Sequence, residues 1–117
     1  MDETTDVDVR EDPERGAFVL TVDGVEAGHL DIRRRQAPVA IVLIHTEVEP
    51  AWSGQGLGGR LVRGAFEAAR AEGVAVIPLC EYAQRWVGQH PEYLADVTPH
   101  DRRRLGLPEP TTAGEDQ

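Results

Sequence analysis

Residues 39–60 read VAIVLIHTEVEPAWSGQGLGGR, and the rest of the predicted fold is arranged around this stretch. Val39 to Ile44 is an unbroken apolar run, which is typical of a central strand covered on both faces. After a loop that contains several glycines, apolar residues recur at helical spacing from Leu57 to about Glu72. Val74 to Ile77 then predicts a short buried strand. A strand–helix–strand crossover of this kind makes its two strands parallel.

The flanking residues predict an antiparallel hairpin before this unit and a helix after it. Ala17 to Val22 alternates in the manner of a strand, and Asp23-Gly24 is typical of a two-residue type I′ turn. The apolar phase changes along the return strand, which predicts a bulge at Gly28. Glu81 to Gln89 predicts the last helix. The fold class is therefore mixed α/β, with antiparallel N-terminal strands, a parallel strand–helix–strand unit and a C-terminal helix.

Length and charge indicate one small domain that does not bind nucleic acid. The chain has 117 residues, 12 basic and 21 acidic, for a net charge of −9, whereas a nucleic-acid-binding surface is basic. Residues 16–97 hold the apolar pattern, and we expect residues 1–15 and 98–117 to be flexible tails. No apolar run approaches the roughly 18 residues of a membrane span, and the acidic start is unlike a secretory signal. We expect a cytoplasmic monomer or weak dimer.

The glycine-containing loop has the chemistry of a phosphate site. Gly54, Gly56, Gly58 and Gly59 surround one turn that opens a helix. Glycines allow positive φ and close backbone approach, and the first amides of a helix lack internal partners and carry partial positive charge. Arg60 adds a possible charge-assisted contact to a phosphate. A tight strand-to-helix connection without a ligand explains the same residues, so both interpretations stay open from composition alone.

Two common nucleotide motifs do not fit this loop. Gly54-x-Gly56-x-x-Gly59 matches the dinucleotide-binding fingerprint, but in that fold the strand runs directly into the first glycine. Here eight residues separate His45 from Gly54. The Gly-Lys-Ser/Thr of a nucleoside-triphosphate P-loop is also missing from the sequence.

The loop resembles the signature of the GNAT acetyltransferase superfamily, Gln/Arg-x-x-Gly-x-Gly/Ala. The chain has Ser53-Gly54-Gln55-Gly56-Leu57-Gly58, with Ser53 at the position of Gln or Arg. Four further segments, and with them about residues 16–97, are similar to a compact single-domain branch of that superfamily. They are HTEV at His45–Val48, PLC at Pro78–Cys80, Tyr82–Trp86 and His90–Tyr93.

The resemblance implies an acetyl-CoA-dependent N-acetyltransferase that uses acetyl-CoA as cosubstrate and no metal. It places Glu47 and Val48 beside the pantetheine arm. It implies that the loop amides hold the pyrophosphate, through Gly54, Gln55, Gly56, Leu57, Gly58, Gly59 and Arg60. Its acceptor is an amine, and an open cleft with a negative net charge suits a protein or peptide lysine or a polyamine. The alternative is a CoA- or acyl-CoA-binding or interaction module without turnover.

Four residues are candidates for the chemistry. His45 and Glu47 are two apart on an extended strand, so they share a face, and either could relay the proton of an amine. Cys80 lies at the same carboxyl end of the parallel strands. It could accept the acetyl group, donate a proton to the coenzyme thiolate, or only pack in the core. Tyr82 could also donate that proton. A metal site at His45, Glu47 and Glu49 has no second ligand cluster to support it, and we do not expect one.

Overall fold

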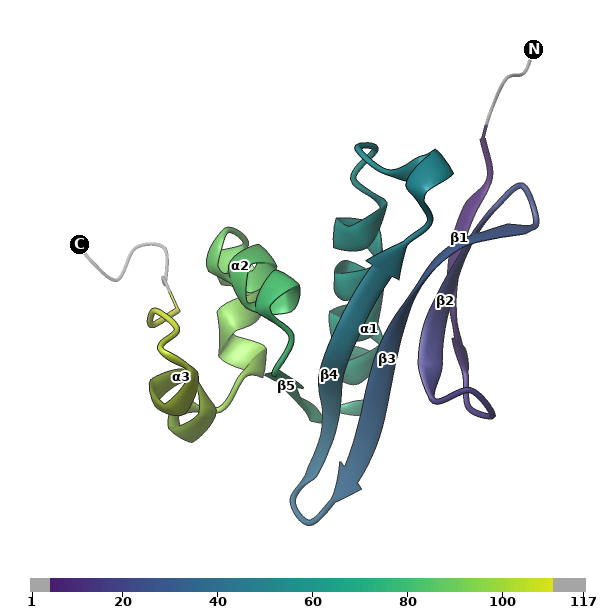
Figure 1. Cartoon of the computed structure of the whole chain (residues 1–117). Coiled ribbons are helices and arrows are strands. Elements are labelled where there is room, and N and C mark those ends of the chain that lie inside the picture. The colour runs from purple at the N-terminus through teal and green to yellow at the C-terminus, as the bar shows by residue number, and fades with distance from the viewer. Residues whose placement is uncertain (1–4, 111–117) are drawn as a thin grey trace.

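The computed structural model describes residues 5–110 as a mixed sheet with its longest helix packed on one face (Figure 1). The sheet has five strands in the order β1-β2-β3-β4-β5, all antiparallel except the parallel pair β4–β5. This confirms the predicted fold class. The strands are β1 (Val7–Asp12), β2 (Ala17–Val22), β3 (Val25–Gln36), β4 (Val39–Val48) and β5 (Ala75–Pro78). The helices are η1 (Pro50–Trp52), α1 (Leu57–Glu72), α2 (Glu81–Gly88), η2 (Pro91–Asp96) and α3 (Pro99–Leu105).

The β2–β3 hairpin follows the sequence prediction closely. Asp23 and Gly24 both have positive φ, 50° and 85°, as a type I′ turn requires. Opposite Leu20 the β3 strand carries an extra residue, so that Ala27 and Gly28 form the predicted bulge. A Cβ on Gly28 would lie 2.8 Å from the carbonyl oxygen of Glu47 on β4. Glycine is therefore needed here for the close approach of β3 and β4.

Helix α1 packs on one face of the sheet, and its buried side forms part of the core. Its buried side includes Leu61, Val62 and Phe66, none of which is exposed to solvent. The helix ends as predicted at Gly73, which has a φ of 73° and donates its backbone N–H to the last turn. On α1, a Cβ at Gly64 would lie 2.8 Å from Val9, so this glycine lets β1 pack against the helix. No helix among the described residues is long and apolar enough to cross a membrane.

The expectation of flexible tails is wrong for parts of both ends. Val7–Asp12 forms the edge strand β1, because Val7 and Val9 alternate with the acidic residues and reach the core. Pro99–Leu105 forms α3, where the Thr98 side chain accepts the backbone N–H of Asp101 as an N-cap. Residues 1–4 and 111–117 lie outside the described residues.

Strands β4 and β5 separate halfway along β4, at a point that we call the fork. Their pairing ends at Leu43 and Pro78, where the Leu43 carbonyl accepts the N–H groups of both Leu79 and Cys80. Next to this point β4 carries an extra residue, because Asp31 pairs with His45 and Ile32 with Leu43. Ile44 is thus a bulge, and it reverses which side chains of β4 face α1. The fork and the bulge together position the site.

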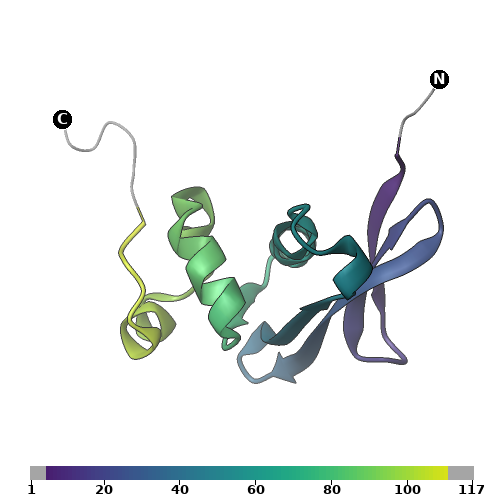
Figure 2. The same ribbon diagram turned by 45° about the horizontal axis from the view of Figure 1, so that its top comes forward.

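Figures 1 and 2 show α1 on one face of the sheet, with α2 beside it. On the opposite face, Leu105 of α3 packs only against the small cluster of Ala40, Val42 and Ile77. Over β1, β2 and the ends of β3 and β4 near the fork, none of the helices between residues 5 and 110 covers that face. We call this the open face.

Candidate functional site

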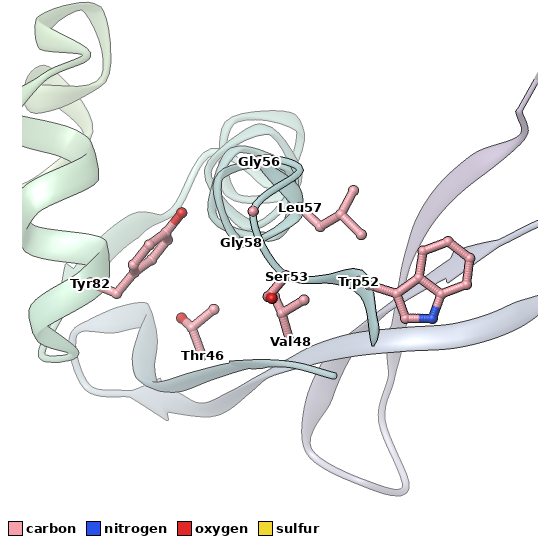
Figure 3. Close-up of a pocket in the computed structure, with 9 residues that line it drawn as sticks. Thr46, Val48, Trp52, Ser53, Gly56, Leu57, Gly58 and Tyr82 are labelled. Carbon is pink, nitrogen blue, oxygen red and sulfur yellow. The ribbon is translucent and has the colours of Figure 1, made fainter. Parts of the chain in front are cut away.

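A cleft of about 360 Å³ lies between β4, α2 and the beginning of α1 (Figure 3). It is lined by Thr46, Val48, Trp52, Ser53, Gly54, Gly56, Leu57, Gly58 and Tyr82. The side chains of Thr46 and Val48 point from β4 toward the first turn of α1, and Tyr82 closes the side formed by α2. The cleft therefore lies at the carboxyl ends of two parallel strands, where ligands bind in open α/β sheets.

Beyond the fork, β4 offers a free backbone edge to this cleft. The N–H of Glu49 donates to Ala27 on β3, and the carbonyl of Glu47 also approaches β3. Because backbone groups alternate along an antiparallel strand, those of Thr46 and Val48 point the other way, toward the edge that β5 has left. An extended ligand can bond there as a strand would. Of the two residues expected beside the pantetheine arm, Val48 lines the cleft, whereas the side chain of Glu47 does not.

The first turn of α1 opens into the cleft, and no side chain caps its backbone N–H groups. Gly56 is the N-cap residue, with a φ of 77° and no side-chain capping bond, and the first turn contains no acidic residue. Gly54 also has positive φ, 78°, and a Cβ at either position would meet nothing within 4 Å. Both glycines therefore serve the left-handed turn. The turn directs the helix amides and their partial positive charge into the cleft, as an anion site requires.

Gly58 and Gly59 also have a packing role that the sequence analysis did not predict. A Cβ on Gly58 would lie 2.8 Å from Tyr82 Oη, and one on Gly59 would lie 3.0 Å from Trp86 Nε1. These glycines allow α2 to pack directly against the beginning of α1. This close packing places Tyr82 at the cleft. The backbone amides of the two glycines remain part of the first turn of α1.

Gln55 of the loop and Arg60 of α1 lie outside the wall of this cleft, and both are exposed. Arg60 lines a shallower neighbouring depression of about 320 Å³ between α1 and α2, together with Arg63 and His90. Gly56 and Tyr82 mark the boundary, since they line both depressions. Two guanidinium groups thus lie beside the first turn of α1, in a chain that is acidic as a whole.

An aromatic cluster fixes α2 against α1. Trp86 stacks on His90 with ring centroids 4.0 Å apart and on Phe66 at 5.8 Å. Tyr93 donates its hydroxyl to Glu67 and accepts a bond from Arg63 at 3.2 Å. The bond to the Glu67 carboxylate raises the pKa of Tyr93, because it stabilises the neutral phenol. The cluster supports the wall of the cleft that carries Tyr82.

Cys80 lies behind the wall of the cleft, where it contacts Thr46, a lining residue that the sequence analysis did not select. It is the N-cap residue of α2, only 9% exposed, and its Sγ lies 3.4 Å from Thr46 Oγ1. The structure thus brings together Cys80, Tyr82 and Thr46. Along HTEV, side chains alternate between the two faces of the strand, so Thr46 lies on the face opposite to that of His45 and Glu47. This alternation is the sequence feature that could have identified Thr46.

His45 and Glu47 lie on the open face instead. They share a face as predicted, with His45 Nε2 3.6 Å from Glu47 Oε1, and their side chains are about 60% exposed. Ile41 and Leu43 face α1, so plain alternation would also turn His45 and Glu47 toward α1. The bulge at Ile44 reverses that phase. His45 therefore does not share the side of β4 on which Thr46 contacts Cys80, so the structure does not bring His45 and Cys80 together. No group of three potential ligands within residues 5–110 is placed to hold a metal ion.

The fold and the site define a mixed α/β domain with a ligand cleft at a parallel-strand fork. A family model described as GCN5-related N-acetyl-transferase matches residues 17–97. The chain belongs to this family. No curated protein matches the chain in sequence.

One solved structure supports the same fold, and two further matches are weaker. The chain is similar to the aminoglycoside N-acetyltransferase AAC(6')-Iy in complex with CoA, with a TM-score of 0.54 and 13% identity over 97% of this chain and 95% of that chain. The same enzyme in complex with a bisubstrate analogue, CoA-S-monomethyl-acetylneamine, has a TM-score of 0.47 and 15% identity. The match covers 83% of this chain and 64% of that chain. A Trypanosoma brucei acetyltransferase has a TM-score of 0.48 and 18% identity over 67% of this chain. This chain covers 63% of the trypanosomal protein.

Proposed function

We propose that the protein transfers an acetyl group from acetyl-CoA to an amine. The observation that carries this proposal is the fork, because it leaves a free edge of β4 running from the uncapped start of α1 toward Cys80. The amides of the first turn, with Arg60 nearby, would hold the pyrophosphate. The pantetheine arm would bond to the edge at Thr46 and Val48 and bring the thioester to the fork. Family membership supports this assignment.

The reaction needs two proton transfers. An alkylamine with a pKa near ~10.4 must lose a proton before its nitrogen can attack the thioester carbonyl. As the C–N bond forms and the C–S bond breaks, the coenzyme thiolate takes up a proton. Tyr82, at the wall of the cleft, is our proposed donor of that proton. His45 and Glu47 are our proposed acceptors of the proton of the amine, from the open face.

Cys80 has two possible roles in this scheme. It could replace Tyr82 as proton donor, or its sulfur could take the acetyl group first and pass it to the amine. Intact mass after incubation with acetyl-CoA separates these roles, because Cys80 is the single cysteine of the chain. An acetyl adduct that disappears in Cys80→Ser supports the covalent route, and an unmodified wild-type protein with full activity rules it out.

Two assays test the function itself. Calorimetric titration with acetyl-CoA should show saturable binding, and radiolabelled acetyl-CoA should label an amine from a panel that includes a lysine peptide and a polyamine. Tyr82→Phe should keep binding and lose much of the turnover. If acetyl-CoA does not bind, the proposed function is contradicted.

A second candidate, a CoA-binding module without turnover, is favoured by one observation. His45 and Glu47 lie on the side of β4 opposite Thr46, which contacts Cys80, so the described part of the cleft has no histidine or carboxylate in its wall. This candidate predicts coenzyme binding without acetyl transfer to any amine. A cytoplasmic location and a monomeric or weakly dimeric state stay predictions, which fractionation and light scattering check.

A further inference from the structure

The depression between α1 and α2, which we call the basic depression, has no role in the acetyl transfer proposed above. Three side chains in its wall can carry positive charge: Arg60, Arg63 and His90. The two arginines are three residues apart on α1, so they lie on the same side of the helix. No carboxylate within residues 5–110 forms an ion pair with either guanidinium group. On a chain with a net charge of −9, this local positive charge suits an anionic ligand.

The guanidinium group of Arg63 is oriented by aromatic residues rather than by an acid. It lies 5.3 Å from the ring centroid of Trp86 and 5.6 Å from that of Tyr93. Its Nη1 donates to the Tyr93 hydroxyl at 3.2 Å, and the same hydroxyl donates to the carboxylate of Glu67. Arg63 and Glu67 are four residues apart on α1, a spacing at which an ion pair could form directly. Tyr93 therefore stands between the two charges, and the remaining N–H donors of Arg63 stay available for an anion.

The basic depression adjoins the place where we expect the pyrophosphate of the coenzyme. Gly56 and Tyr82 line both the basic depression and the cleft. Gly56 is also the N-cap residue of α1, and the amides of the turn that follows it are the proposed pyrophosphate site. In CoA a single ribose ring separates the pyrophosphate from a third phosphate, on the 3′ oxygen. With the pyrophosphate at the first turn, the basic depression is a neighbouring cationic partner for this third phosphate.

An acidic protein that presents a thioester on a phosphopantetheine arm could also bring negative charge to this place. The overall charge of the chain disfavours that partner, because a whole acidic surface would approach a protein with a net charge of −9. A depression of about 320 Å³ also suits one compact group better than a protein surface. The third phosphate of the free coenzyme is therefore the better match.

We propose that the basic depression binds the 3′-phosphate of the coenzyme, and that Arg63 thereby selects the complete coenzyme over donors that lack this phosphate. This inference rests on the use of acetyl-CoA proposed above. Arg63 donates to the phosphate oxygens, and Arg60 adds a second positive charge. Tyr93 is a positioning residue that acts through Arg63.

Calorimetric titration of the protein with acetyl-CoA and with 3′-dephospho-acetyl-CoA tests the proposal. Wild type should bind acetyl-CoA at least about tenfold more tightly, which is the scale of one charge-assisted hydrogen bond. Arg63→Gln should remove most of this preference by weakening the binding of acetyl-CoA, and its affinity for the dephospho compound should not change. Arg103→Gln is the matched control, because it removes the same charge from an exposed residue of α3 that lines neither the cleft nor the basic depression.

The positioning role of Tyr93 has its own test in the same titrations. Tyr93→Phe should reduce the preference for acetyl-CoA, because Arg63 can then pair with Glu67 instead of the phosphate. Glu67→Gln in the Tyr93→Phe background should restore part of the preference, which it could not do if the first variant had only damaged packing. A Tyr93→Phe protein with the wild-type preference contradicts the positioning role.

Equal affinity of wild type for the two compounds, or an Arg63→Gln protein that keeps the preference, overturns the proposal. Turnover with an acetylated acyl carrier protein that matches turnover with acetyl-CoA also overturns it, and would assign the basic depression to a protein partner. If neither compound binds, the proposed function itself is contradicted and this inference falls with it. Equal binding of the two compounds contradicts this inference alone, so the two failures are distinguishable.

Discussion

Replacing Gly58 by Ala tests whether the close contact of α1 and α2 serves the site rather than stability. The new Cβ would lie 2.8, 2.9 and 3.1 Å from Tyr82 Oη, Cζ and Cε2, well inside ordinary contact distance. The helix backbone is fixed by core packing, whereas the Tyr82 ring is 36% exposed and can turn toward solvent. We therefore expect the ring, and not the helix, to move.

The free energy of unfolding should change little. A helical Gly→Ala replacement gains up to about 1 kcal/mol, and the lost ring contact costs a similar amount, near the low end of the 1–3 kcal/mol range for overpacking. The net change in the free energy of unfolding should be within about 1 kcal/mol, which corresponds to a shift in Tm of less than roughly 8 °C. If Tyr82 is the proton donor as proposed, turnover should fall more, by about 100-fold, because a displaced donor loses its catalytic contribution.

Thermal denaturation and acetyl-transfer kinetics on the same preparations measure both effects. Gly88→Ala is the matched control, since it lies in α2 and a Cβ there would meet nothing within 4 Å. In a Tyr82→Ala background, Gly58→Ala should reduce turnover no further. Unchanged turnover in the single variant, or a loss explained by unfolding, would refute this reasoning.

Three further predictions concern β4, Cys80 and an ion pair. Gly28→Ala should lower Tm by more than Gly58→Ala, because its Cβ would lie 2.8 Å from a backbone oxygen that cannot turn away, and thermal denaturation checks this. Thr46→Val should change the rate at which iodoacetamide alkylates Cys80, and Thr46→Ser should restore it, if the hydroxyl positions the thiol; equal rates in all three proteins contradict that role. Arg34 bonds to both oxygens of Glu72 and lowers the pKa of that carboxyl below its usual value, so this stabilisation is present at neutral pH and is lost as pH falls through the lowered pKa. Tm should therefore fall less steeply in acid for Glu72→Gln than for wild type, and parallel curves would contradict it.

Much of the fold could be predicted because local patterns and tertiary structure agree. The hairpin turn, α1 with its terminal Gly73, and the parallel crossover all follow from spacing that the structure retains. The strand β1 was missed because its acidic residues dominate the composition, although Val7 and Val9 alternate correctly for a strand at the core. Only pairing with β2 and contact with α1 show that the segment folds.

The residue types of the site could be predicted from the sequence, but the face of the sheet on which each side chain lies could not. The sequence pointed to His45, Glu47, Cys80 and Tyr82, yet the bulge at Ile44 decides which of them face the cleft. A bulge within an unbroken apolar run leaves no mark in the spacing of those residues. The pairing of Asp31 with His45 depends on the β3–β4 register in the same way, so residue order alone could not reveal it.

A crystal structure of the protein with bound CoA tests the central claim most directly. The account predicts the pyrophosphate at the amides that follow Gly56, and the pantetheine arm bonded to the backbone of Thr46 and Val48, with its sulfur at the fork. A coenzyme bound elsewhere, or an arm that does not pair with β4, would contradict the account.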